Sequence, residues 1–368
     1  MNSVHVGDGA GSVSCSTQVA VVGGGPIGLE LAVALKHAGI PFQVFEAGNL
    51  GHTVSWWAPQ TRWFSSNERI AIAGVPLLTE DQSKSTREQY LNYLRGVATQ
   101  FQLDIRTQTS VKSIQSLDSG FELTTVPRGG DPAARREVWH ADSVVLATGG
   151  TDFPKRLGIP GEDLPHVDGY LRETHRYFNR RVLVIGGRNS AIEAALRLHH
   201  AGARVTLSYR GRELPERSIK YWLLPEIKGL LRSGRIRPML ATEPIEITPG
   251  QVRLRDIGEA PGPEQLVEVD DVLALIGYEQ DKTLFRNIGV ELIGDMQRPS
   301  FDEATMETNV EGIFVAGTAV AGTQSSSYKV FLENCHEHVD TIVAHLSGRK
   351  ANTPNPAYQQ QAVTQPET

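Results

Sequence analysis

Two glycine-rich turns in the sequence have the spacing that binds the phosphates of a dinucleotide. In the first, an apolar run at 19–22 leads into Gly23-x-Gly25-x-x-Gly28. The first glycine permits a tight turn, the second lets a pyrophosphate approach the backbone, and the third lets helix and strand pack closely. The following helix presents free N–H groups and its positive dipole end to the phosphates. Glu46 ends the next apolar run, where a carboxylate can accept hydrogen bonds from ribose hydroxyls.

The same strand–turn–helix–strand pattern returns at 181–210 and aligns with the first copy without gaps. Gly186 corresponds to Gly23, Ala191 to Gly28, and Tyr209 to Glu46. Two copies of one unit in a chain are much harder to obtain by chance than a single motif. The repeat therefore indicates two dinucleotide sites rather than two unrelated α/β units.

The residue that ends the second strand discriminates between the two sites. Glu46 suits a ribose with both hydroxyls free, as in FAD, because a carboxylate repels a 2′-phosphate. In the second copy Tyr209 is followed by Arg210, and a guanidinium can bind the 2′-phosphate of NADPH. Lys220 follows closely. Arg188 replaces the middle glycine of the second turn, and we expect its side chain to turn outward and contact a phosphate.

The elements around these turns are consistent with an α/β protein of about two domains. A buried-type strand ends in small residues at 143–150, strands alternate over 103–140 around a turn at 127–132, and another buried strand lies at 309–322. Helices are expected at 86–100, 219–232 and 329–346, and short strands around residues 236, 245 and 252. The expected division is a flexible N-terminus (1–16), an FAD-binding domain in two parts (17–157 and 278–350), an NAD(P)H-binding domain (158–277) and a disordered tail (351–368).

Composition excludes several classes of partner. The net charge of −6 leaves no basic footprint for nucleic acid. No apolar run approaches the roughly 20 residues that span a bilayer, and residues 1–16 lack the features of a signal peptide. Cys15 and Cys335 are the only cysteines and no CxxC is present, which argues against a disulfide framework and fits a reducing cytoplasm. No metal site is expected.

An aromatic segment follows the first unit and has two interpretations. Trp56, Trp57, Trp63 and Phe64 either pack a loop or cover a flat ring system. In the second interpretation Ser65, Ser66 and Asn67 supply polar contacts.

Several segments together resemble the two-dinucleotide flavoprotein disulfide reductases. They are GGGPIGL, FSSNE, ATGG, GIPGEDLP, YFNRRVLVIGGRNS, ARVTLSYRG, SIKYWLLPE and METNVEGIFVAG. The chain looks thioredoxin-reductase-like and, within that group, is similar to the bacillithiol-disulfide reductase (YpdA-type) family. The resemblance covers nearly all of residues 18–346. It implies two Rossmann-like, three-layer ββα domains, with the NADPH domain inserted into the FAD domain.

The resemblance also implies residues for each cofactor. Thr318 stands where thioredoxin reductases have an aspartate beside the ribityl chain, and a hydroxyl can still make that bond. The residues expected at FAD are Gly23, Gly25, Pro26, Ile27, Gly28, Glu46, Ala47, Ser65, Ser66, Thr148, Gly149, Gly317 and Thr318. Those expected at NADPH are Gly186, Gly187, Arg188, Asn189, Ser190, Arg210 and Lys220.

No catalytic thiol is evident. Family members thought to act by thiol chemistry read GGGPCG in the first turn, whereas this chain has Ile27 there. Cys335 is a weak catalytic candidate, because a single cysteine inside the final helix is more often a buried hydrophobic residue than a nucleophile. Cys15 lies in the expected flexible lead-in and is a poorer one. The spacing of the histidines does not single out a proton donor.

Hydride transfer from NADPH to FAD is the predicted core reaction, and four alternatives remain for the fate of the electrons. The acceptor is a low-molecular-weight disulfide such as bacillithiol disulfide, or a non-thiol acceptor such as a quinone or a ferredoxin-type protein. A flavin monooxygenase would carry an FxGxxxHxxxW/Y-type stretch, which is not found. A non-catalytic redox sensor is the fourth alternative. We also expect a cytoplasmic homo-oligomer.

Overall fold

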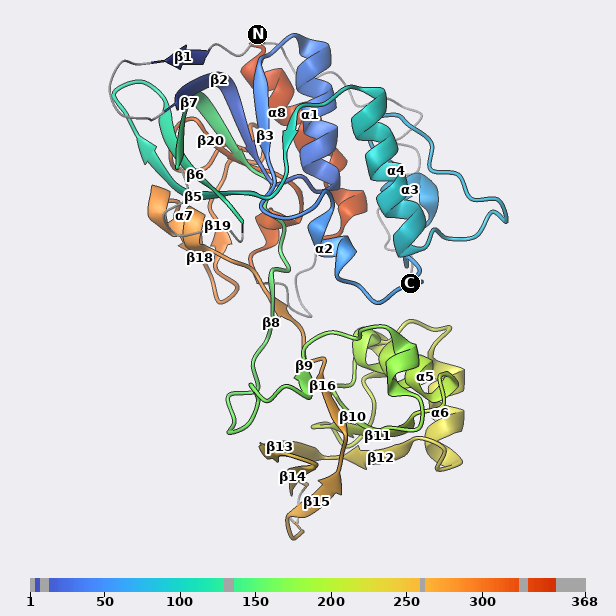
Figure 1. Ribbon diagram of the computed structural model, residues 1–368. Coiled ribbons are helices and arrows are strands. Elements are labelled where there is room, and N and C mark those ends of the chain that lie inside the picture. Colours follow the sequence, from blue (N-terminus) through green and yellow to red (C-terminus); the bar gives the residue numbers. More distant parts are fainter. Residues whose placement is uncertain (1–3, 7–12, 129–135, 259–261, 324–329, 349–368) are drawn as a thin grey trace. The chain divides into compact units, whose positions relative to one another are not determined.

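The chain folds into two units, each built on a β-sheet that contains parallel strands (Figure 1). The computed structural model describes residues 4–6, 13–128, 136–258, 262–323 and 330–348. Within these ranges, the first unit contains the residues up to 56, 60–152 and those from 279 onward. The second unit contains 153–278 together with 57–59.

The sheet of the first unit brings the carboxyl ends of its parallel strands to one edge. Val22 lies opposite Phe45 and Leu146, and Leu146 lies opposite Val315. The loops that follow these residues therefore start side by side. The parallel strands are β4 (Ile105–Arg106), β3 (Phe42–Phe45), β2 (Val13–Val22), β7 (Glu137–Leu146) and β20 (Ile313–Val315). Three strands of this sheet pair antiparallel: β1 (Val4–Val6) with β2, β6 (Phe121–Pro127) with β7, and β5 (Thr109–Ser116) with β6. A separate two-stranded sheet is formed by β18 (Leu292–Ile293) and β19 (Arg298–Pro299).

Helix ends in the first unit follow local sequence signals. Helix α1 (Pro26–Ala38) has its proline in the first turn, where no amide hydrogen is needed, and stops at Gly39 in the left-handed conformation. Helix α4 (Arg87–Gln100) starts with a capping box between Thr86 and Gln89. The remaining helical elements are α2 (His52–Ser55), α3 (Asn67–Ile70), α7 (Thr283–Ile288), η3 (Gly317–Ala321), η4 (Leu332–Asn334) and α8 (His336–Leu346).

Two expectations about the chain termini are wrong. Strand β2 begins at Val13, so residues 13–16 are not a flexible lead-in, and Cys15 is buried beside β7. The final helix begins at His336, after a 3-10 turn, which places Cys335 before the helix rather than inside it. Lys329, most of the expected turn at 127–132 and the expected tail at 351–368 lie outside the described residues.

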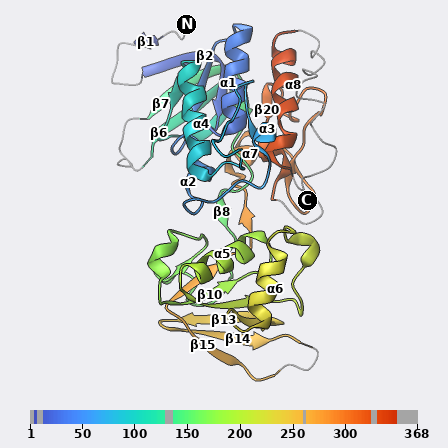
Figure 2. The same cartoon turned by 90° about the vertical axis from the view of Figure 1, so that its right-hand side faces the viewer.

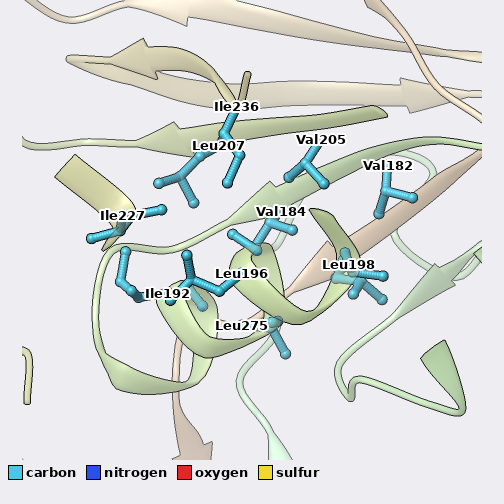
Figure 3. Packing of buried hydrophobic residues seen from close by; sticks show 14 of the residues in the cluster. Val182, Val184, Ile192, Leu196, Leu198, Val205, Leu207, Ile227, Ile236 and Leu275 are labelled. Atoms are coloured by element: carbon cyan, nitrogen blue, oxygen red, sulfur yellow. The ribbon is translucent and has the colours of Figure 1, made fainter. Parts of the chain in front are cut away.

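The second unit has three layers. Successive side chains of a β-strand point to opposite faces of the sheet. In the strand at 181–185, Val182 and Val184 therefore face the helices, whereas Leu183 and Ile185 face the antiparallel strands. The first of these cores is drawn in Figure 3, where strand and helix side chains interdigitate. Figure 2 shows α5 and α6 on one face of the sheet and β13–β15 on the other. The parallel strands are β12 (Arg237–Leu240), β11 (Arg204–Tyr209), β10 (Arg181–Ile185), β16 (Asp271–Ala274) and β9 (Val167–Asp168); the helices are η1 (Thr174–Tyr177), α5 (Asn189–His200), η2 (Glu216–Ser218) and α6 (Leu224–Arg232); the antiparallel strands are β13 (Thr242–Thr248), β14 (Gln251–Asp256) and β15 (Gln265–Glu268).

One helix of this unit is shorter than expected. A continuous helix over 219–232 is wrong, because α6 starts only at Leu224 and a single 3-10 turn precedes it at Glu216–Ser218. Pro225 explains the difference, since a proline fits the first turn of a helix but not its interior.

The α/β class with two Rossmann-like domains, one inserted into the other, is confirmed. The chain crosses between the units at 152/153 and again at 278/279, through the paired strands β8 (Phe153–Pro154) and β17 (Tyr278–Glu279). None of the helices in the described ranges is both long and apolar enough to cross a membrane.

Asp152 joins the two ends of the insertion inside the first unit. Its amide donates to the carbonyl oxygen of Glu279 at 2.8 Å, and its Oδ2 accepts from the amide of Asp281 at 2.8 Å. Burial raises the pKa of Asp152 to about 7, and the nearby Asp281 carboxylate adds to the shift. Folding therefore disfavours the ionised carboxyl, so stability is lost as the pH rises from about 4 to about 7.

The substitution Asp152→Asn tests this assignment. An amide oxygen can still accept from Asp281 but carries no charge. We expect the variant to have a free energy of unfolding roughly 1–2 kcal/mol above wild type at pH 8 and equal to it at pH 4. Chemical denaturation at both pH values measures the difference. Asp118→Asn, at an exposed turn, is the matched control and should show no pH-dependent gain. An equal effect of both substitutions would contradict the assignment.

Candidate functional site

The first glycine turn is shaped by close backbone contacts. A Cβ atom at Gly23, whose φ is +118°, would lie 2.3 Å from the carbonyl oxygen of Ala147. A Cβ at Gly28 would lie 2.0 Å from the carbonyl oxygen of Gly23. Gly25 has nothing within 4 Å of its would-be Cβ and precedes α1 directly. The first and third glycines thus serve packing, and the middle one leaves open space over the amides of the helix N-terminus.

Glu46 closes onto this turn from the end of β3. Its Oε2 accepts from the amide of Gly24 at 2.7 Å and its Oε1 from the amide of Gly48 at 2.6 Å. Burial raises the pKa of the Glu46 carboxyl, although these two bonds and the charge of Arg128 favour the ionised form. Each carboxylate oxygen has a second lone pair and can accept from a further donor such as a hydroxyl.

Two further loops reach the same sheet edge, after β7 and β20. Gly149 and Gly317 have φ values of +87° and +72°. A Cβ at Gly149 would lie 4.0 Å from the Oγ1 of Thr318, and one at Gly317 would lie 3.3 Å from the Cβ of Ile27. The structure therefore brings together the three segments that the sequence assigned to one cofactor. The Oγ1 of Thr148 is buried and has no hydrogen-bond partner in the described part of the chain.

Two side chains that the motifs did not single out hold these loops. His338 accepts from the amide of Gly317 through Nδ1 at 3.2 Å. Burial lowers the pKa of His338 to about 4, which keeps this nitrogen free to accept at neutral pH. The Nε2 of Gln280 donates to the carbonyl oxygens of Gly149 and Ala319. Neither residue belongs to a recognisable motif, because each acts through backbone groups distant in sequence.

The aromatic and serine segment is tied to its own surroundings. Trp63 packs on Tyr90 with ring centroids 4.5 Å apart. The amide group of Asn67 accepts from Ser85 and donates to Ser83, so Asn67 connects loops of the protein. The hydroxyl of the buried Ser65 donates to Glu333 Oε1 at 2.9 Å. Ser66 directly precedes α3, and Ala47 is exposed next to Glu46.

The second turn repeats the first, with an aromatic ring in place of the acid. A Cβ at Gly186, whose φ is +140°, would lie 2.5 Å from the carbonyl oxygen of Leu275. A Cβ at Gly187 would overlap the ring of Tyr209 at 2.4 Å. Tyr209 thus closes onto its turn as Glu46 does, without a carboxylate. Arg188 directly precedes α5 with an exposed side chain, and its φ of −107° is an ordinary extended value.

Basic groups lie beyond the end of β11. Arg210 is exposed immediately after Tyr209, and Lys220 is half-buried. The Oδ1 of Asn189 accepts from the amide of Lys220 at 2.8 Å, which ties the basic segment to the first residue of α5. Ser190 is exposed in the same first turn. The arrangement offers cations and free amides to an anionic ligand.

Neither cysteine is placed for thiol chemistry. Cys335 is fully buried and its thiol donates to the carbonyl oxygen of Phe331 at 3.1 Å. Burial raises the pKa of Cys335 well above its usual range, and nearby carboxylates add to the shift. Such a thiol is a poor nucleophile, since the thiolate is the reactive form. Cys15 is buried inside β2. Among the described residues no group of His, Cys, Asp or Glu side chains could hold a metal ion.

Comparisons with known proteins agree with this architecture. The family model described as pyridine nucleotide-disulphide oxidoreductase matches residues 20–317. The bacilliredoxin reductase Bdr of Bacillus subtilis (strain 168) is 37% identical over 90% of this chain and 97% of its own. A ferredoxin–NADP reductase of Ignicoccus hospitalis is 28% identical over 81% of this chain and 88% of its own. The solved bacillithiol disulfide reductase Bdr (YpdA) from Bacillus cereus superposes with a TM-score of 0.83 at 36% identity, covering 90% of this chain and 99% of that one.

The residues present fit the cofactors of such enzymes. The open space at Gly25, the buried hydroxyl of Thr148 and the second lone pairs of Glu46 are suited to a dinucleotide in the first unit. The enzyme is an NADPH-dependent flavoprotein oxidoreductase whose cofactors are FAD and NADPH. The chain belongs to the pyridine nucleotide-disulphide oxidoreductase family.

Proposed function

We propose that the enzyme uses NADPH to reduce a low-molecular-weight disulfide of the bacillithiol type. The observation that carries this proposal is the similarity to bacilliredoxin reductase and to the bacillithiol disulfide reductase structure over nine-tenths of the chain. The reaction converts one disulfide, NADPH and a proton into two thiols and NADP⁺. Cytoplasmic location is part of the proposal, because two buried free thiols fit a reducing compartment. A homo-oligomeric state is likewise proposed.

The first unit is proposed to hold FAD. Gly25 and Pro26 would receive the pyrophosphate at the start of α1, Glu46 would accept from the ribose, and Thr148 and Thr318 would bond the remaining polar groups. Ile27 would lie against the flavin side of the turn, since it packs on Gly317. The complete proposed set is Gly23, Gly25, Pro26, Ile27, Gly28, Glu46, Ala47, Ser65, Ser66, Thr148, Gly149, Gly317 and Thr318.

The second unit is proposed to hold NADPH. Gly186 and Gly187 would form the turn, and the amides at the start of α5 would bind phosphate. Arg188 is exposed and free to contact a phosphate oxygen, and Arg210 would bind the 2′-phosphate. The complete proposed set is Gly186, Gly187, Arg188, Asn189, Ser190, Arg210 and Lys220.

The chemistry proposed for the acceptor does not require a protein thiol. When bound, NADPH supplies a hydride and FAD passes the two electrons onward. In the described part of the chain, Ile27 replaces the thiol of the first turn and Cys335 is inaccessible. The disulfide must therefore take its electrons without a mixed disulfide to the enzyme.

A non-thiol acceptor is the second candidate. The similarity to a ferredoxin–NADP reductase favours it, and a chain without a reactive thiol can serve such an acceptor unchanged. A ferredoxin-type protein or a quinone would replace the disulfide as the electron sink.

A turnover screen distinguishes the acceptors. Purified FAD-loaded enzyme is mixed with NADPH and with bacillithiol disulfide, other low-molecular-weight disulfides, a quinone, a ferredoxin or oxygen. We expect kcat/KM for bacillithiol disulfide to exceed that for the other acceptors at least tenfold. NADPH oxidation is followed by absorbance and thiol release by a colorimetric reagent. Faster turnover with quinone or ferredoxin would support the second candidate instead.

Arg210→Ala tests the proposed 2′-phosphate contact. A charge-assisted bond contributes about 1.5–3 kcal/mol, so removing it should weaken NADPH binding roughly tenfold to hundredfold and leave NADH binding unchanged. Stopped-flow reduction of the flavin measures both. Arg232→Ala, at the exposed end of α6, is the matched control and should keep the wild-type preference. A wild-type enzyme that prefers NADH would contradict the assignment.

Cys335→Ser tests the absence of thiol chemistry. A hydroxyl can replace the bond to Phe331, so we expect kcat for the disulfide to stay within about twofold of wild type. The flavin content of the purified variant controls for folding. A folded, FAD-loaded variant that loses disulfide turnover but still reduces a quinone would show that Cys335 is catalytic after all.

A further inference from the structure

Gln280 connects two of the loops at the sheet edge of the first unit. Its Nε2 donates to the carbonyl oxygen of Gly149 at 3.0 Å and to that of Ala319 at 2.8 Å. Gly149 follows β7 and Ala319 lies in η3, so the two loops are 170 positions apart in sequence and are held by one amide. Gln280 itself is only 5% exposed.

The orientation of this amide is determined by its partners. Both Gly149 and Ala319 present carbonyl oxygens, which only accept, so the NH₂ group must face them. The Oε1, about 120° from Nε2 around Cδ in the same plane, then points away from these two carbonyl oxygens. It is buried and has no hydrogen-bond partner in the part of the chain that the structure describes.

The two bonds that the NH₂ group of Gln280 makes to carbonyl oxygens do not explain why its Oε1 is buried without a partner. A buried amide oxygen without a donor is costly, and such groups in native proteins are nearly always satisfied. The hydroxyl of Thr148, next to Gly149, is buried and unpartnered in the same way. Two unsatisfied polar atoms are therefore connected to the loop after β7: the hydroxyl of Thr148 precedes Gly149 in the chain, and Oε1 belongs to the amide that binds the Gly149 carbonyl oxygen. The Thr318 hydroxyl is close to the same loop, since it lies 4.0 Å from the position of a Gly149 Cβ.

We propose that Gln280 is a binding and positioning residue of the FAD site. Its NH₂ group holds the Gly149 and Gly317–Ala321 loops at their spacing, and its Oε1 accepts a hydrogen bond from an N–H or hydroxyl group of the bound FAD. The inference rests on the proposed placement of FAD in the first unit. The backbone of Gln280 is held in turn, because the ammonium of the buried Lys282 lies 3.5 Å from its carbonyl oxygen and 2.7 Å from Thr323 Oγ1.

The experiment compares Gln280→Met with Gln43→Met. Methionine keeps the length of the side chain and removes both hydrogen-bonding groups. Gln43 is the matched control, since it is also buried in the first unit and its Nε2 donates to the carbonyl oxygens of Val44 and Asp104. The measurements are the dissociation constant of FAD from the apoprotein, the visible spectrum of the bound flavin and the urea stability of the apoprotein.

We expect Gln280→Met to weaken FAD binding at least tenfold and to shift the flavin absorption bands, whereas Gln43→Met lowers apoprotein stability without either effect. A role confined to bracing would lower apoprotein stability and leave the spectrum unchanged. The proposal is overturned if FAD affinity or the spectrum of Gln280→Met equals that of wild type, or if Gln43→Met has the same effects. A wild-type protein that binds no FAD would instead refute the proposed function.

Gln280→Glu keeps the test decisive if the methionine variant does not fold. An ionised glutamate cannot donate to the two carbonyls, whereas its protonated form restores one donor. FAD affinity of this variant should therefore rise at least threefold between pH 8 and pH 6, relative to wild type at the same pH values. A pH-independent ratio would count against the proposal.

Discussion

Gly28 lies so close to the carbonyl oxygen of Gly23 that a single methyl group there would come within 2.0 Å of it. This contact presses helix α1 onto the end of β2 and, through Gly23, onto the carbonyl oxygen of Ala147 after β7. The first turn and the β7 loop are therefore locked together before any ligand is considered. The register of the strands positions the remaining loops, because parallel pairing aligns the ends of β2, β3, β7 and β20 at one edge of the sheet. The glycine turn and the start of the β7 loop in the first candidate site depend on this packing.

The two units use the same backbone with different side chains at the decisive position. In both, the residue at the end of the second strand closes onto the glycine turn, as Glu46 does on Gly24 and Tyr209 on Gly187. The carboxylate of Glu46 is satisfied by two amides and keeps lone pairs for hydroxyls, whereas Tyr209 leaves a neutral surface followed by the exposed Arg210. The charge at this one position is enough for a site to distinguish a ribose with free hydroxyls from one with a 2′-phosphate. Under the proposed assignment, the duplicated scaffold would thereby bind FAD in the first unit and NADPH in the second.

The burial of both cysteines limits how electrons can pass from the flavin to the acceptor. Of the two cysteines, one lies inside β2 and the other is fully buried before α8 with a raised pKa. The turn position where the resemblance led us to look for a thiol is occupied by Ile27, whose Cβ would lie 3.3 Å from a Cβ added at Gly317. An isoleucine offers no thiolate for disulfide exchange. Electron transfer without a protein thiol is the consequence that the proposed function incorporates.

The sequence by itself determined the parts that depend on local chemistry. The glycine spacing predicted both turns, and the runs of apolar residues predicted the strands of both sheets, because short-range sterics decide them. The charges of Glu46 and Arg210 predicted which nucleotide each turn prefers. Only the tertiary structure decided that β2 extends back to Val13 and that Cys335 precedes α8. It also decided the roles of Gln280, His338 and Asp152, which act on backbone groups far away in sequence. No local pattern can encode such contacts, since they exist only after distant loops have met at one sheet edge.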